Sequence, residues 1–164
     1  MKTLDANIEA VVTAFAEACA RKEGFYVTEQ EAKERQTRYP TIATRNNNPL
    51  NLRKWGAYPI RDGFANFVKV TRGKQVPDLE AGWRAAKFQV RKNIVERRLS
   101  FFTFFAGERN SAGAVVGYPG FAPESDGNNP TEYALFVLTA LKEKGLIAPT
   151  ADIHSQILSV VLIR

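Results

Sequence analysis

The chain has 164 residues, of which 45% are hydrophobic and 24% charged, and these values predict a single globular domain spanning residues 1–164. No apolar run approaches the roughly 20 residues that a membrane-spanning helix needs, and the only cysteine, Cys19, excludes an internal disulfide. Because no cysteines and histidines cluster in the sequence, we expect neither a metal site nor a cofactor.

The formal net charge of +6 predicts an anionic partner, although nucleic acid, anionic lipid and bacterial cell wall all qualify. The basic residues are densest between Arg84 and Arg98, where Glu96 interrupts them. We interpret this stretch as the solvated face of a helix rather than a binding stripe. Since it carries no recognition motif, we expect no specific nucleic-acid binding.

The first half of the chain predicts two helices, a turn region and a small β element. Residues 5–22 carry apolar side chains at helical spacing, and Gly24 is a typical stop. Thr28 and Glu31 form a possible capping box for a polar helix over 29–37. Residues 41–56 have turn composition. Residues 57–73 alternate weakly around an Asp62-Gly63 turn signal, which indicates two or three strands.

The second half predicts further helices. Asp78 is a suitable N-cap for a helix over 79–98, and Ser100 is one for a short aromatic-rich helix. Residues 107–129 form a long loop of the kind that is usually functional. Asn129 and Pro130 favour the start of a helix that continues to Lys144, and a last helix is expected over 151–162. The expected fold class is therefore α+β and mostly α.

Glu23 is the most interesting carboxylate of the sequence. It stands at the end of the first predicted helix, directly before Gly24, Phe25 and Tyr26. Glycoside cleavage needs an acid that still holds its proton near neutral pH, which an apolar and partly dry pocket favours. A glutamate at a helix end is also common on ordinary protein surfaces, so the local sequence leaves both interpretations open.

The segment RNNNPLNLR (45–53) contains four asparagines within one predicted turn. Asparagine tolerates turn conformations, and its amide both donates and accepts hydrogen bonds, as the acetamido and hydroxyl groups of sugars require. Asn48 and Asn51 are therefore candidate sugar-binding residues. The alternative is that these amides satisfy only the local backbone.

Taken together, the segments Glu23–Tyr26, Arg45–Arg53, 78–86 and 121–133 resemble the lysozyme-like superfamily. The similarity is to the phage-associated muramidases and lytic transglycosylases that carry an RNNNPGNLR-type motif, and it covers most of residues 8–140. This sequence departs from the motif at Leu50, where the family usually has glycine, and at Phe121, where tyrosine is common.

The resemblance implies a lysozyme-like fold with a small β element between helical lobes, and bacterial peptidoglycan as the partner. It implies that Glu23 is the single catalytic acid. It further implies that Asn48, Asn51, Tyr26, Tyr133 and Asn129 contact the substrate. Tyr133 can equally be a core residue, and Asn129 is also the predicted helix cap.

The reaction expected from the resemblance is the cleavage of the β-1,4 bond between N-acetylmuramic acid and N-acetylglucosamine. We interpret Asp62 as a turn residue and Asp126 as a loop residue, so no second carboxylate is as strong a catalytic candidate as Glu23. A single carboxylate favours a lytic transglycosylase over a hydrolysing muramidase. A non-catalytic wall-binding or virion domain of the same fold remains an alternative.

The expected site of action is the bacterial cell wall. Asp5 and Glu9 interrupt the segment where a secretory signal needs apolar residues. We therefore expect the protein to reach the wall by phage-type release, virion delivery or specialised secretion. We also expect a monomer.

Overall fold

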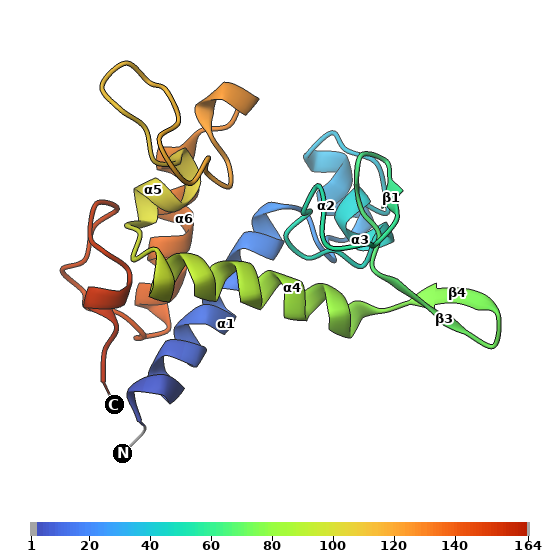
Figure 1. Ribbon diagram of the computed structural model, residues 1–164, viewed down its shortest axis with the longest axis horizontal. Coiled ribbons are helices and arrows are strands. Elements are labelled where there is room, and N and C mark those ends of the chain that lie inside the picture. Colours follow the sequence, from blue (N-terminus) through green and yellow to red (C-terminus); the bar gives the residue numbers. More distant parts are fainter. Residues whose placement is uncertain (1–2, 164) are drawn as a thin grey trace. The chain divides into compact units, whose positions relative to one another are not determined.

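The computed structural model describes residues 3–163 and divides them into two compact units (Figure 1). Unit 1 combines the described residues up to Phe15 with those from Val90 onward, and unit 2 is the intervening segment Ala16–Gln89. The described residues form six α-helices and two small antiparallel sheets. The prediction of a mostly α, α+β chain is confirmed. None of the described helices has the length and apolar character needed to cross a membrane.

Unit 2 contains three helices that end in the same way. They are the end of α1 (Leu4–Lys22), α2 (Glu29–Glu34) and α3 (Ile42–Arg45). A residue with positive φ follows each helix: Gly24, Gln36 and Asn47. In each case the next residue donates its N–H to the carbonyl five positions earlier, the Schellman arrangement that satisfies the last carbonyls of a helix. The predicted capping box of Thr28 and Glu31 is present at the start of α2. The helix α3 lies in a segment for which the sequence predicted only turns.

Two short hairpins make up the β element of unit 2. Strand β1 (Ile60–Arg61) pairs with β2 (Phe64–Ala65), and the connecting turn contains Asp62 and Gly63 as predicted. Strand β3 (Val68–Thr71) pairs with β4 (Lys74–Pro77), and this hairpin leads directly into α4 (Figure 1). The sheet element is therefore longer than the predicted range 57–73.

The helix α4 (Leu79–Arg91) packs against the asparagine-rich turn through a glycine. Asp78 caps it, since Asp78 Oδ1 accepts a hydrogen bond from the Ala81 N–H at 3.2 Å. A Cβ atom at Gly82 would lie 2.0 Å from the carbonyl oxygen of Asn47. No side chain fits at this position unless the turn moves, so Gly82 sets the distance between helix and turn.

We expect Gly82→Ala to destabilise the protein by about 1–3 kcal/mol, because the overpacking outweighs the better helix propensity of alanine. Thermal or denaturant unfolding measures the effect. Arg84→Ala is the matched control on the same helix, and it should change stability by less than about 0.5 kcal/mol, because its ion pair with Glu80 is exposed. A Gly82→Ala variant as stable as the parent would show that helix and turn do not touch as described.

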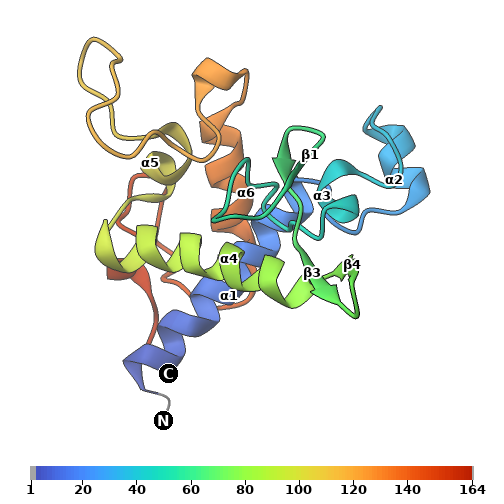
Figure 2. The same cartoon turned by 45° about the vertical axis from the view of Figure 1, so that its right-hand side comes forward.

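Unit 1 is built around aromatic side chains. The helix α5 (Phe101–Ala106), capped by Ser100 as predicted, packs against α6 (Pro130–Glu143) (Figures 1 and 2). Phe15, at the unit 1 end of α1, lies among three buried phenylalanines of α5, with ring centroids 4.6 to 6.1 Å away: Phe101, Phe104 and Phe105. These rings form the core of the unit.

The predicted helix over 79–98 is interrupted, because Lys92–Glu96 winds as a wider π-helix (η1). The predicted last helix over 151–162 is wrong. This segment contains only a short 3₁₀ turn, η3 (Leu158–Val160), and the Ile157 N–H donates to the Leu99 carbonyl at 3.0 Å. Backbone hydrogen bonds to other segments of unit 1 therefore take the place of those that a helix would form here. Between α5 and α6 the loop contains one 3₁₀ turn, η2 (Glu124–Asp126).

Candidate active site

Glu23 is the C-cap residue of α1. The Gly24 N–H donates to the Arg21 carbonyl at 3.1 Å, and the Phe25 N–H donates to the Ala20 carbonyl at 2.9 Å. Gly24 has a φ of +84°, which a glycine adopts readily. Phe25 then packs with Ala20 and Ala43 in a buried apolar cluster. The helix end that carries Glu23 is thus fixed by backbone bonds and by packing.

Glu23 lines a pocket of about 250 Å³ that belongs entirely to unit 2. The side chain is half-buried. The pocket lining is about equally polar and apolar. Its residues come from the end of α1, from the segment after α2, from α3 and from the asparagine-rich turn: Lys22, Glu23, Gly24, Arg35, Thr37, Thr41, Ile42, Ala43 and Asn51. The structure therefore brings Glu23 and Asn51, two of the predicted site residues, to one cavity.

Asn51 lines the pocket and carries a buried side-chain oxygen that no described residue bonds. It has a φ of +52°, and its N–H donates to the Asn48 carbonyl at 2.9 Å, which closes the turn. Its side-chain Oδ1 is buried and accepts no hydrogen bond from any described residue. A buried acceptor without a partner is unfavourable, so a donor that reached Asn51 Oδ1 would bind there favourably.

The Asn48 side chain, unlike that of Asn51, has a structural role. Its side chain is completely buried, and Nδ2 donates to the carbonyls of Leu52 and Ala65, both at 2.9 Å. Its Oδ1 accepts from the Leu52 N–H, also at 2.9 Å. Asn48 thus shapes the turn, and its amide is not exposed for a sugar to contact.

Leu50 shows how this turn manages without the glycine of the family motif. It is fully buried and does not adopt a positive φ. The positive φ values of the turn fall on Asn47 and Asn51, residues that tolerate this conformation better than leucine. The turn therefore avoids a glycine-only conformation at Leu50.

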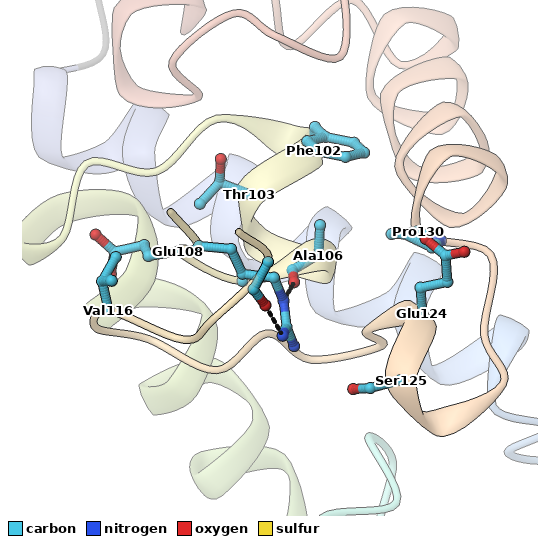
Figure 3. Close-up of a pocket in the computed structure, with 11 residues that line it drawn as sticks. Phe102, Thr103, Ala106, Glu108, Val116, Glu124, Ser125 and Pro130 are labelled. Carbon is cyan, nitrogen blue, oxygen red and sulfur yellow. Dashed lines mark hydrogen bonds between the residues drawn. The ribbon is translucent and has the colours of Figure 1, made fainter. Parts of the chain in front are cut away.

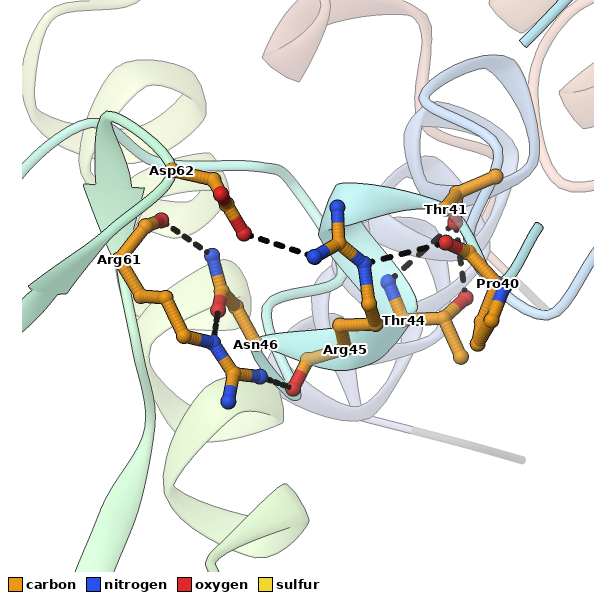
Figure 4. A network of polar contacts seen from close by, with 7 residues as sticks. All are labelled: Pro40, Thr41, Thr44, Arg45, Asn46, Arg61 and Asp62. Carbon is orange, nitrogen blue, oxygen red and sulfur yellow. Dashed lines mark hydrogen bonds and ion pairs between the residues drawn. The ribbon is translucent and has the colours of Figure 1, made fainter. Parts of the chain in front are cut away.

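A polar network holds the turn region to the first hairpin (Figure 4). Arg45 Nη1 lies 2.8 Å from Asp62 Oδ2, and Arg45 Nε donates to the Pro40 carbonyl at 3.1 Å. Two hydrogen bonds join Asn46 and Arg61. Asn46 Nδ2 donates to the Arg61 carbonyl at 2.9 Å, and Arg61 Nε donates to Asn46 Oδ1 at 2.8 Å. Asp62 is therefore bound in an ion pair at the hairpin turn, in agreement with its predicted role as a turn residue.

Arg35 is one of several lining residues that the sequence did not predict, and it brings a charge to the pocket. It follows α2, and its Nη1 donates to the Arg21 carbonyl at 3.1 Å, which ties this segment to the end of α1. The sequence had indicated only a polar helix over 29–37 for this part of the chain. Its guanidinium and the ammonium of Lys22 add two positive charges to a pocket that also holds the Glu23 carboxylate.

Tyr26 lies next to Glu23 in sequence but does not line the pocket. Its side chain is 63% exposed, and its ring lies over Phe25 with centroids 4.1 Å apart. Its N–H donates to Thr44 Oγ1 at 2.9 Å, which links the segment to α3. Tyr26 remains accessible to a ligand at the surface.

The other two predicted site residues belong to unit 1. Tyr133 is 4% exposed, and its ring stacks on Phe105 at 4.3 Å, so it is a core residue. Asn129 caps α6, where its Oδ1 accepts from the Glu132 N–H at 3.1 Å. Both positions favour a structural role, for Tyr133 in the core and for Asn129 as the cap of α6.

A larger pocket, of about 970 Å³, lies in unit 1 (Figure 3). Residues of α5, of the following loop and of η2 line it, and none of the predicted site residues is among them. The loop 107–129 was expected to be functional because of its length, and most of the lining comes from it. No group of three or more potential metal ligands occurs within residues 3–163.

Comparison with known proteins adds no family assignment. No family model, no curated protein and no solved structure matches this chain significantly. The likeness to the lysozyme-like superfamily therefore depends on the motifs of the sequence itself.

Proposed function

We propose that the protein is a lytic transglycosylase that cleaves the β-1,4 bond between N-acetylmuramic acid and N-acetylglucosamine in peptidoglycan. One observation carries this proposal: Glu23 and Asn51, from two separate sequence motifs, line the same pocket. A carboxyl group and an asparagine amide that line one pocket are suited to an acetamido sugar.

In the proposed reaction, the Glu23 carboxyl group donates its proton to the glycosidic oxygen, and the bond from that oxygen to the anomeric carbon breaks. The 6-hydroxyl of the same muramic acid then attacks the anomeric carbon and gives its proton back to Glu23. The ring that forms is a 1,6-anhydro sugar. No water is consumed, and the tethered hydroxyl benefits from a high effective concentration.

Asn51 is assigned a positioning role in this scheme. Its Oδ1 would accept the N–H of an acetamido group and fix the sugar ring with respect to Glu23. The backbone bonds that define the turn already hold Asn51, so little conformational freedom is lost when the sugar binds.

The choice of a transglycosylase over a muramidase follows from the carboxylates. Among the described residues that line the pocket, Glu23 is the only acidic one. Asp62 is engaged by Arg45, and Asp78 caps α4. Hydrolysis with two carboxylates would need a second one beside the sugar to direct water.

Mass spectrometry of purified peptidoglycan after incubation with the protein tests the proposal. We expect muropeptides that end in 1,6-anhydro-N-acetylmuramic acid, which are lighter by one water molecule than the hydrolysis products. Reducing ends alone would instead identify a muramidase. Undigested peptidoglycan that still binds the protein would identify a wall-binding domain.

A further inference from the structure

The 970 Å³ pocket of unit 1 has the size of a ligand site and a rigid frame. Two glycines allow the chain to cross itself closely there. A Cβ at Gly107 would lie 2.4 Å from the Pro119 carbonyl oxygen, and one at Gly120 would lie 2.6 Å from the Phe105 carbonyl oxygen. These backbone contacts fix the beginning and the end of the loop segment that lines the pocket.

Arg109 brings a positive charge to this pocket in a fixed orientation. Its Nε donates to the Ala106 carbonyl at 3.0 Å, Nη1 to the Gly113 carbonyl at 3.1 Å and Nη2 to the Pro119 carbonyl at 3.4 Å. These bonds use three of the five N–H groups of a guanidinium. Two N–H groups remain, and no carboxylate within residues 3–163 pairs with this charge.

Two carboxylates lie on different sides of the same pocket. Figure 3 shows Glu108 with Val116 on one side and Glu124 on the other. Glu108 Oε1 accepts from the Tyr118 N–H at 2.9 Å. Glu124 is exposed in η2 and makes no ion pair within the described part of the chain. The lining also includes apolar side chains, among them Phe102, Ala106, Val116 and Pro130.

We infer that this pocket binds a short peptide that carries both a carboxylate and an ammonium group. The carboxylate would accept from the remaining N–H groups of Arg109, and the ammonium would lie against Glu124, because Glu108 already accepts from the Tyr118 N–H. With two negative charges and one positive, the lining favours such a ligand over a purely anionic one. The stem peptide of peptidoglycan has this chemistry when it contains a diamino acid. The identity of the ligand rests on the proposed function, whereas the site itself does not.

Calorimetric titration with N-acetyl-Ala-Gln-Lys tests this inference, because the peptide has a single carboxylate, at its carboxy terminus, and a single ammonium, on the lysine side chain. Two altered probes remove one charge each: a carboxy-terminal amide and a peptide acetylated at the lysine Nζ. We expect each alteration to weaken binding by about two- to fivefold, the range of a partly exposed ion pair. Equal affinity for all three peptides, or no binding at millimolar peptide, would overturn the inference.

A variant pair locates the ammonium. Glu124→Gln should weaken binding of the parent peptide by about two- to fivefold and leave the lysine-acetylated peptide unaffected. Glu143→Gln is the matched control, since Glu143 is also exposed in unit 1, lies outside the pocket and changes the net charge equally. Equal weakening by both variants would show that only net charge matters and would reject the site.

The free peptide contains no glycan, so this titration is independent of cleavage at Glu23. Peptide binding without any glycan cleavage would reject the proposed enzyme but keep the peptide site. Cleavage of peptidoglycan without peptide binding would reject the peptide site alone.

Discussion

Replacing Glu23 by glutamine is expected to lower the rate of peptidoglycan cleavage by about a hundredfold or more, the usual contribution of a positioned acid. Glutamine has nearly the same shape but cannot donate the proton that the leaving oxygen requires. The fold should remain, because the backbone hydrogen bonds that the N–H groups of Glu23, Gly24 and Phe25 donate at the helix end do not involve the carboxyl group. Lysis of purified cell walls and thermal unfolding together measure the two effects.

Glu17→Gln is the matched control for this experiment. Glu17 lies on the same helix, is exposed and does not line the pocket. The control variant should keep both its activity and its melting temperature. If Glu23→Gln retains most of the parent activity, Glu23 is not the acid.

Asn48→Ala should lose about 3 kcal/mol of stability, because three backbone groups lose their partners inside the protein. These groups are the N–H and the carbonyl of Leu52 and the carbonyl of Ala65, each now bonded to the Asn48 amide at 2.9 Å. Unfolding by heat or denaturant should show the loss directly. Activity should fall together with stability, since the turn that carries Asn51 depends on Asn48.

Asn51→Gly separates the binding role from the structural one. Glycine adopts the positive φ of this position readily, so the turn should survive, while the unpaired Oδ1 is removed. We expect reduced activity at an unchanged melting temperature, the reverse of a purely structural defect. Parent-like activity in Asn51→Gly, or parent-like stability in Asn48→Ala, would contradict the roles assigned to these two residues.

The sequence predicted best those features that depend on neighbouring residues. The capping box of Thr28 and the caps at Asp78, Ser100 and Asn129 are all present, because a side chain and a backbone N–H three positions apart determine each of them. The Asp62-Gly63 turn is local in the same sense. At the start of α1 the cap is Thr3 and not Asp5, because Thr3 Oγ1 accepts from the Ala6 N–H at 3.2 Å.

Features that depend on distant partners were missed. The segment 151–162 has apolar residues at helical spacing, yet Asp152 favours a local turn by accepting from the His154 N–H at 2.8 Å. Its later residues then pair with backbone near Leu99 and Leu146. Strand β4 is too polar to be recognised alone and is specified by its partner β3.

The candidate site likewise combines residues that local sequence signals identify with residues that only distant contacts bring there. Glu23 could be located because helix-end signals surround it, and Asn51 because of its unusual turn. Arg35 could not, because it reaches the pocket only through the packing of the segment after α2 against the end of α1. For Asn48, residue type suggested an exposed amide, and only the three-dimensional structure revealed its burial.

The discontinuous make-up of unit 1 has a consequence for how the chain folds. Phe15 belongs to the same aromatic core as Phe101 and Phe105, although they are far apart in sequence. Closing a loop of roughly 85 residues opposes the first such contact by about 4 kcal/mol of chain entropy. The hairpins and helix ends of unit 2 need no such closure, because their bonds join residues a few positions apart. Early formation of these local elements would shorten the free chain between the two halves of unit 1 and so lower the entropic barrier to assembling its core.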